Sequence, residues 1–588
     1  MARLSFQKVG EYLRPHTKPL VLGILALFIV NGLSVAIREV IRSVVALLEK
    51  MVDGGTADVA NPIGALLGSA AGVVLLACVM WVIRMASRLW IFGVGRSIEY
   101  ELRQKIFNHL LTLSPSYFSQ QSVGEIISIV TSDVENIRRL LGFALLSLVN
   151  TIFAYGLTVP AMIAIDLRLT VLALAPYPFM MLLVRAFGDK MREEQQAVQE
   201  KLSDVSSLLQ EDLNSMALIK TYAQEENERR AFRQKNLELL NANLQMARTR
   251  NILFPALGGI VGVSLLLIVW QGGLLIIEGK FNLSGLITLI LYVEYLTFPT
   301  ALLGFTLTVM QRGQVSIDRV EGLLRVPPAI VDPPQAVPVN LATVKGKVEV
   351  RHLSFTYAGA KTPALVDVSF TVEAGETLAI IGAIGSGKST LANLIPRLLP
   401  VEPGTIFIDD IDITKMRVQD LRSIVTYVPQ ESFLFSLPIL DNIRYGKPDA
   451  SLAQVEYYAE QAHIHSEILN FHQKYETLVG ERGITLSGGQ RQRTALARAL
   501  LMDAPILLLD DALSSVDNQT AAQILANLPR QKTVILITHK LSAAMNCDRI
   551  LILDRGRVHA IGTHQELMYS SALYQKLWQQ YQLEQAVS

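Results

Sequence analysis

The chain has 588 residues, of which 51% are hydrophobic and 18% are charged, and its formal net charge is +1. This length predicts two or more domains, and so high an apolar fraction is typical of a protein that lies partly in a membrane. A net charge near zero disfavours the class of proteins that bind nucleic acid. The two cysteines, Cys78 and Cys547, lack metal-ligand spacing, and no disulfide between them is expected.

The chain begins with an amphipathic pattern and continues with six apolar runs. In residues 1–18, Phe6, Val9, Tyr12 and Leu13 recur at helical spacing between basic residues, which predicts a short helix on the membrane surface. We expect each of the six runs to cross a membrane as a helix within 19–310, at about 19–37, 63–94, 141–164, 169–184, 253–277 and 286–309. The alternative is a soluble protein with six core helices, which is disfavoured because runs of this length rarely form a soluble core.

The connections between the runs predict the orientation of the chain. The long connections after the second and fourth runs are rich in Lys and Arg, whereas the other three are short and poor in them. Basic connections remain in the cytoplasm, so we expect cytoplasmic helical extensions there and both termini on the cytoplasmic side. A short polar turn interrupts each long connection, at about 116–125 and 214–219.

Residues 311–345 differ in composition from the apolar region before them. They are first charged and then rich in proline, which predicts a linker. From 346 to 588, apolar strand patterns and helical patterns predict a separate α/β domain.

The most specific local motif lies near the start of that domain. An apolar run at 377–381 predicts a strand, a helix is expected from 391, and between them stands the pattern G-x-x-x-x-G-K-S. In such a loop backbone N–H groups surround the phosphates of ATP, Lys388 reaches the β- and γ-phosphates, and Ser389 binds Mg²⁺. A chance glycine-rich turn is disfavoured, because strand, loop and helix follow in the right order. The predicted nucleotide-binding residues here are Gly382, Ala383, Ile384, Gly385, Ser386, Gly387, Lys388, Ser389 and Thr390.

A second motif, Leu-Ser-Gly-Gly-Gln at 486–490, carries a family resemblance. With the phosphate loop and the six apolar runs, it makes nearly the whole chain resemble a half-transporter of the ATP-binding cassette (ABC) exporter family. The resemblance implies an α-helical six-span membrane domain of the type I exporter fold, fused to an α/β phosphate-loop nucleotide-binding domain. It also implies two such domains closing on two ATP molecules, with the γ-phosphate on the opposite subunit gripped by Ser487, Gly488, Gly489 and Gln490. A purely structural helix cap is the alternative for this motif.

The resemblance assigns roles to single residues elsewhere in the domain. It implies that adenine stacks on Tyr357 and that Gln430 contacts Mg²⁺ and the attacking water. Asp510, at the end of a buried-strand pattern, would organise Mg²⁺, and His539 would contact the γ-phosphate. Residues 514–517 match a loop that crosses to the other ATP site. Outside this context, Tyr357 would predict only packing and Gln430 would predict little.

One position departs from the family pattern. The family places Glu after the strand as the carboxylate that polarises the attacking water, whereas here Asp511 follows Asp510. Asp retracts the carboxylate by about 1.5 Å, and a displacement near 1 Å can cost about 10²-fold in rate. We therefore expect slow hydrolysis at this chain's own phosphate loop, and a second, different half-transporter with Glu as partner. A homodimer with two slow sites is the alternative.

Together these features predict an ATPase that exports lipophilic or amphipathic compounds, or flips them between leaflets, in a bacterial plasma membrane. Soluble cassette ATPases are excluded by the six runs, importers usually carry nucleotide domains on separate chains, and nothing supports a channel. The polar turns resemble coupling helices that transmit domain closure to the membrane helices. Ionisable residues at membrane depth either line the substrate pathway, form ion pairs within the membrane, or extend their charged ends to its surface: Arg38, Glu39, Arg42, Arg84, Arg88 and Glu294.

Overall fold

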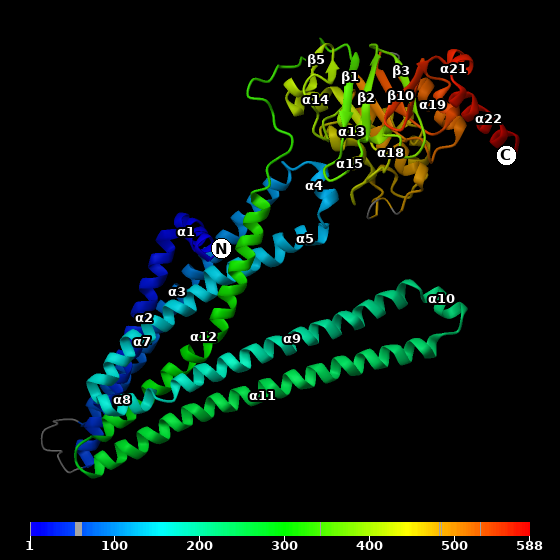
Figure 1. The fold of residues 1–588 in the computed structure, drawn as a ribbon. Helices are drawn as coiled ribbons and strands as arrows, with labels where there is room; N and C mark the ends of the chain where they lie inside the picture. The colour runs from blue at the N-terminus through cyan, green and yellow to red at the C-terminus, as the bar shows by residue number, and fades with distance from the viewer. Residues whose placement is uncertain are drawn as a thin grey trace. The chain divides into compact units, whose positions relative to one another are not determined.

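The computed structural model describes residues 2–52, 62–340, 343–480, 483, 485–529 and 531–587. The chain divides into two compact units, Met1–Leu111 with Ser122–Val326 and Thr112–Gln121 with Pro327–Ser588 (Figure 1). The first unit is built from long helices, whereas the second contains two β-sheets.

Apolar helices make up the first unit, because a helix satisfies every backbone polar group inside a membrane. Six helical stretches are long and apolar enough to cross a membrane, which confirms the six-span expectation: Lys8–Met51, Gly64–Leu110, Val123–Ile165, Leu167–Asn214, Glu225–Ile277 and Leu283–Leu324. The helices are α1 (Ala2–Leu13), α2 (Thr17–Val52), α3 (Pro62–Leu110), α5 (Val123–Ser128), α6 (Val134–Arg139), α7 (Leu145–Ile165), α8 (Leu167–Leu174), α9 (Tyr177–Asn214), α10 (Met216–Thr221), α11 (Glu225–Ile277) and α12 (Leu283–Leu324).

Two elements differ from the sequence expectation. The fourth run, 169–184, is split between α8 and α9 at Pro176, which has no N–H to continue a helical ladder. The sixth helix runs on to Leu324, so the first part of 311–345 is helical and not a linker. The change in composition there marks the end of the apolar face and not the end of the helix.

The helices α9 and α11 lie side by side along their length and are joined by α10 (Figure 1). Polar contacts fix the pair, since Thr249 Oγ1 donates to Glu194 Oε1 at 2.8 Å and Lys201 Nζ lies 2.7 Å from Glu238 Oε2. The pair therefore carries α10 at the end of a long antiparallel helical hairpin.

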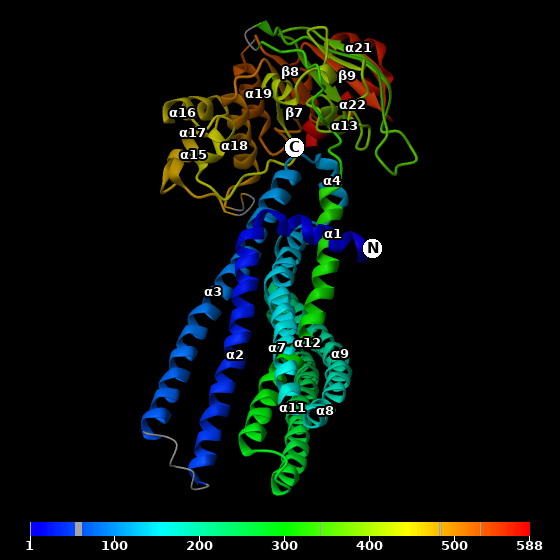
Figure 2. The ribbon, with the colours of Figure 1, turned by 90° about the vertical axis from the view of Figure 1, so that its left-hand side faces the viewer.

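The helix α12 packs against α2, α7, α9 and α11, and its central side chains form much of the core of the first unit (Figure 2). Leu289, Tyr292, Val293 and Leu296 are fully buried. Tyr177 of α9 donates its hydroxyl proton to the backbone carbonyl of Val293 at 2.8 Å. A buried Tyr in an apolar core is thus satisfied by a neighbouring helix.

Charged side chains on α2 contact neighbouring groups within the first unit. The Arg38 guanidinium lies 4.2 Å from the ring centroid of Tyr295 and donates to the backbone carbonyl of Leu291. Glu39 accepts a hydrogen bond from the Tyr292 hydroxyl at 3.2 Å and lies 3.4 Å from Arg42. These contacts favour the structural alternative for the charges on α2, and a role in the substrate pathway stays a prediction.

A six-stranded sheet in the order β10-β9-β3-β8-β7-β6 forms the centre of the second unit. Its strands are β3 (Thr377–Ile381), β6 (Val425–Val428), β7 (Ile506–Asp510), β8 (Thr533–Ile537), β9 (Arg549–Asp554) and β10 (Arg557–Gly562). All residues of β7 and β8 are buried, as expected for parallel strands covered on both faces. Because β3, β7 and β8 run parallel, the residues that follow them meet at one edge: Gly382, Asp511 and Thr538.

A second, antiparallel sheet and a group of helices complete this unit. The sheet has the order β2-β1-β4-β5 and contains β1 (Val348–Phe355), β2 (Leu365–Val372), β4 (Ile406–Ile408) and β5 (Ile411–Asp412). Helices α15 (Ile439–Ile443) and α16 (Leu452–Gln461) pack on α18 (Gly488–Leu501), and α17 (His465–Leu469) packs on α16 (Figure 2). The other helices are α4 (Pro115–Gln120), α13 (Lys388–Leu394), α14 (Val418–Ile424), α19 (Asn518–Asn527), α20 (Leu541–Ala544), α21 (His564–Ser570) and α22 (Ala572–Val587).

Candidate nucleotide-binding site

The loop between β3 and α13 has a backbone that only glycine tolerates at several positions. Gly385 and Gly387 have φ angles of +80° and +101°, in the left-handed region that favours glycine. A Cβ atom on Gly382 would lie 2.2 Å from the carbonyl oxygen of Leu553, and one on Gly387 would lie 2.7 Å from that of Ala364. The glycines therefore let the loop curl tightly ahead of the amino end of α13.

Lys388, the first residue of α13, folds back over this loop. Its Nζ donates to the carbonyl oxygens of Gly382 and Ala383, each at 2.8 Å. Burial lowers the pKa of the Lys388 ammonium, and the negative charges of Asp510 and Asp511 oppose that effect. The ammonium is thus held by two carbonyl oxygens of the loop, which a more strongly charged acceptor can replace.

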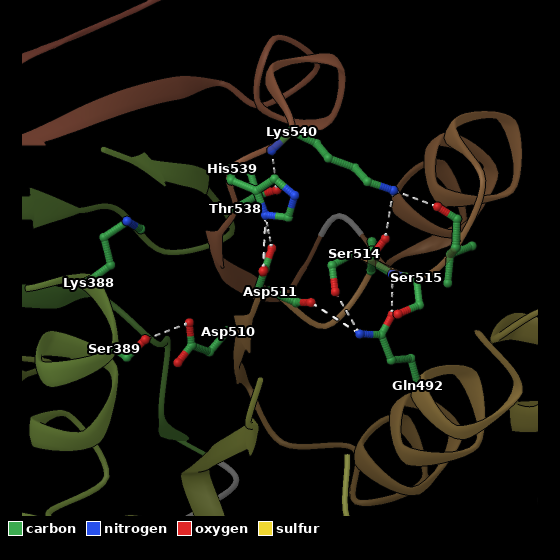
Figure 3. A network of polar contacts seen from close by, with 12 residues as sticks. Lys388, Ser389, Gln492, Asp510, Asp511, Ser514, Ser515, Thr538, His539 and Lys540 are labelled. Atoms are coloured by element: carbon green, nitrogen blue, oxygen red, sulfur yellow. Dashed lines mark hydrogen bonds and ion pairs between the residues drawn. The ribbon is translucent and has the colours of Figure 1, made fainter. Parts of the chain in front are cut away.

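Asp510 ends β7 and is 2% exposed. Ser389 Oγ donates to one carboxylate oxygen at 3.4 Å (Figure 3). The Tyr427 hydroxyl donates to the other at 3.3 Å. Burial raises the pKa of Asp510, the two hydrogen bonds lower it, and the charge of Asp511 raises it. The fold therefore brings together the predicted pair Ser389 and Asp510, whose oxygen atoms are ligands that Mg²⁺ prefers.

Asp511 adopts a φ of +51°, which turns the chain sharply after the strand. Its backbone N–H donates to the carbonyl of Ile537 at 2.9 Å. Nδ1 of His539 lies 2.8 and 3.0 Å from the two carboxylate oxygens of Asp511 (Figure 3). The two predicted catalytic residues Asp511 and His539 are thus in direct contact, because β7 and β8 are neighbouring parallel strands.

The Leu-Ser-Gly-Gly-Gln motif forms the amino end of α18. Ser487 is the N-cap, and its Oγ accepts from the N–H of Gln490 while Gln490 Oε1 accepts from the N–H of Ser487, at 3.2 and 2.9 Å. The Gln490 amide also donates to Glu467 at 2.8 Å. The positive end of the α18 dipole lies at this motif, which suits a phosphate.

Tyr357 and Gln430 lie at the margins of the site. Tyr357 is 42% exposed, its hydroxyl lies 3.1 Å from Thr390 Oγ1, and its ring packs edge-to-face on Phe355. Gln430 is exposed and lies two residues after β6, the strand next to β7. Tyr357 therefore borders the phosphate loop, and an exposed ring beside it is available for stacking.

Two family descriptions match the chain: residues 20–300 match the ABC transporter transmembrane region, and residues 365–514 match the ABC transporter. The probable multidrug resistance ABC transporter ATP-binding/permease protein YheI of Bacillus subtilis is 33% identical over 84% of each chain. The multidrug resistance-like ATP-binding protein MdlA of Escherichia coli is also 33% identical, over 89% of each chain. The chain belongs to the ABC transporter family. A bacterial Atm1-family ABC exporter with ATP bound superposes with a TM-score of 0.77 and 26% identity, over 97% of this chain and 99% of the other.

The membership confirms the predicted architecture of this ABC exporter. It is a multi-pass membrane protein with a nucleotide-binding domain that binds ATP, and the family hydrolyses ATP to drive transport. Tyr427 was not predicted as a site residue, although its place on β6 beside Asp510 follows from strand pairing. Lys540 was also missed, and its Nζ donates to the carbonyls of Leu513 and Val516 (Figure 3). Neither residue stands in a motif, and both are recognised only through contacts in the folded domain.

Proposed function

We propose that this chain is one half of an exporter made of two different ABC chains, and that the ATP site on its own phosphate loop turns over slowly. The observation that carries the proposal is Asp511, which stands where this family has Glu. Its carboxylate is shorter by one methylene and is engaged by His539 Nδ1 at 2.8 and 3.0 Å. A carboxylate held back in this way aligns poorly with an attacking water, and misalignment of about 1 Å costs on the order of 10²-fold in rate.

The other site residues fit the usual division of labour around ATP. Lys388 would exchange its carbonyl partners for β- and γ-phosphate oxygens, and Tyr357 would stack on adenine. Ser389 and Asp510, with Gln430 at the end of β6, would hold Mg²⁺, which neutralises phosphate charge when bound. Lys388, Ser389 and Asp510 lie at the edge where β3 and β7 end, and Tyr357 and Gln430 lie at its margins.

The intact signature suggests that this chain serves a partner's ATP better than its own. Residues 487–490 keep the Ser-Gly-Gly-Gln sequence and the capped helix start that a γ-phosphate requires. The partner's catalytic position would then be Glu, and hydrolysis would occur at the partner's phosphate loop. A homodimer with two slow sites is the alternative, and it predicts weak turnover at both sites.

A groove in the nucleotide-binding unit suits a coupling helix of the partner. It has a volume of about 440 Å³, and its lining includes Phe433, Phe435, Tyr445 and Arg498. The Phe435 and Tyr445 rings stack with centroids 4.5 Å apart. The helix α10 exposes apolar side chains of the kind that fill such a groove, Met216, Leu218 and, just after the helix, Tyr222. We assign the groove to α10 of the partner, so that closure of the nucleotide domains moves α9 and α11.

The transported compounds would be lipophilic or amphipathic. The apolar membrane unit supports this class, and so do the multidrug names of the relatives YheI and MdlA. The basic connections after the second and fourth spans support, by the positive-inside bias, an orientation with both termini in the cytoplasm, and the bacterial relatives support the plasma membrane of a bacterium.

Native mass spectrometry of the tagged chain, purified in mild detergent from its own host, tests the assembly directly. The expected result is a complex with a second half-transporter whose sequence has Glu after the Asp that ends its corresponding strand. Dimers of identical chains would overturn the heterodimer and leave the alternative with two slow sites.

A further inference from the structure

Gln492 is a buried side chain that joins two parts of the nucleotide-binding domain. It lies on α18, two residues after the signature, and is 6% exposed. Its Oε1 accepts from the N–H of Ser515 at 2.8 Å, and its Nε2 donates to Ser514 Oγ at 2.8 Å and to the Asp511 carbonyl at 3.4 Å (Figure 3). Both the oxygen and the nitrogen of the Gln492 amide therefore form hydrogen bonds with the loop that follows β7.

The same loop also packs directly against the signature. A Cβ atom on Gly489 would lie 2.9 Å from the carbonyl oxygen of Ser515, and one on Gly488 would lie 3.4 Å from Ser515 Oγ. On the other side, Lys540 Nζ donates to the carbonyls of Leu513 and Val516, at 3.3 and 2.6 Å. The loop is thus fixed between Lys540 and α18, and its closest approach is to the two signature glycines.

These two segments are separate in sequence but serve one site in the proposed assembly. Residues 487–490 would grip the γ-phosphate on the partner, and residues 514–517 would cross to that same site. Groups that act on one phosphate must keep their mutual geometry to within about 0.5 Å. A residue that holds 487–490 and 514–517 in a fixed relative position would therefore support that geometry, and Gln492 forms the hydrogen bonds that can do so.

We propose that Gln492 is a positioning residue that makes the signature and the 514–517 loop one rigid unit, which this chain lends to the ATP site of its partner. The inference rests on the proposed function, because it requires a partner nucleotide domain. Gln492 does not itself touch the phosphate. Its bond to the Asp511 carbonyl also ties this unit to the chain's own ATP site, so a shift of α18 reaches the backbone of Asp511.

Three variants of the intact transporter, purified with its partner, test the inference. Gln492→Leu removes every bond to the loop, whereas Gln492→Glu keeps an acceptor for the Ser515 N–H and for the Ser514 hydroxyl proton. Gln523→Leu makes the same change at an exposed position of α19 and is the matched control. For each variant, kcat and KM for ATP are measured together with the midpoint of thermal unfolding.

The expected result is a split between kcat and KM. Gln492→Leu lowers kcat on the order of tenfold, because the lent groups lose alignment, while KM changes by less than about twofold. Gln492→Glu recovers most of the rate and Gln523→Leu leaves both constants unchanged. An unchanged kcat in Gln492→Leu overturns the inference. An equal loss of kcat in Gln492→Leu and Gln492→Glu also overturns it, and so does a large drop in the unfolding midpoint of Gln492→Leu.

If the proposed function is wrong, the same experiment gives a different result. A wild-type dimer of identical chains removes the heterodimer, but the variants still test the role of Gln492, because each chain then lends its unit to an identical copy. A wild-type chain that hydrolyses ATP at full rate as a monomer overturns both.

Discussion

The membrane unit and the nucleotide-binding unit use polar side chains in opposite ways. In the membrane unit, polar groups satisfy one another across helix seams, as when Asn31 bonds to Asn150 of α7 and to Tyr295 of α12. In the nucleotide-binding unit, polar groups gather where parallel strands end and stay partly open, as His539 does with 60% of its side chain exposed. Polar side chains that pair with one another between helices stabilise the fold, whereas partly exposed polar side chains at the strand ends are available to bind a ligand.

This difference predicts how substitutions divide. Changes at the open edge alter the rate of ATP hydrolysis and leave the unfolding midpoint almost unchanged. Changes at the helix seams lower the unfolding midpoint and leave the rate almost unchanged.

The largest expected effect is at Lys388. Lys388→Ala removes the ammonium that contacts the loop between β3 and α13, and loss of such a charge should weaken ATP binding at this loop by about 10²-fold. Because hydrolysis is proposed to occur at the partner's phosphate loop, the loss is measured as weaker binding of a fluorescent ATP analogue at this chain's own site. The control is Lys361→Ala, at an exposed position before β2. Full ATP binding by Lys388→Ala would contradict the assignment of the loop.

Asp511→Glu reverses the departure from the family pattern. The added methylene extends the carboxylate toward the attacking water, and we expect ATP turnover of the assembled transporter to rise by about tenfold at this site. Asp511→Asn is the control, since it keeps the length but removes the charge, and it should leave the slow site slow. Equal turnover in wild type and Asp511→Glu would count against the geometric argument.

The elements that the sequence predicted are those determined by consecutive residues along the chain. The apolar runs predicted the six spans and the glycine-rich pattern predicted the tight turn between β3 and α13, because each depends on local composition or on φ angles that glycine permits. The contact between Asp511 and His539 required the pairing of β7 and β8. The contact of Tyr427 with Asp510 likewise required the pairing of β6 and β7. The role of Gln492 depends on the path of the loop after β7, and no local pattern encodes that path.

A substitution at Asn31 tests the prediction for polar side chains between the helices of the membrane unit. It is fully buried, donates to the Leu27 carbonyl and to Asn150 Oδ1, and accepts from the Tyr295 hydroxyl at 2.6 Å. Asn31→Ala leaves these partners unpaired and should cost about 1 kcal/mol, which lowers the unfolding midpoint in detergent by roughly 2 °C. Asn243→Ala is the control, since Asn243 is exposed and its side chain donates to the Leu239 carbonyl of its own helix. A fall in kcat without a fall in midpoint would break the comparison.

The smallest expected effect concerns Tyr427, whose hydroxyl donates to Asp510 at 3.3 Å. Tyr427→Phe removes a long hydrogen bond worth about 0.5 kcal/mol. Because that bond orients the buried carboxylate, the Mg²⁺ concentration for half-maximal binding of a fluorescent ATP analogue at this chain's own site should rise roughly twofold. Tyr357→Phe is the matched control, since it also loses one hydroxyl contact, to Thr390, but does not touch Asp510. An equal shift in both variants would mean that the hydroxyl of Tyr427 has no particular bearing on Asp510 as a metal ligand.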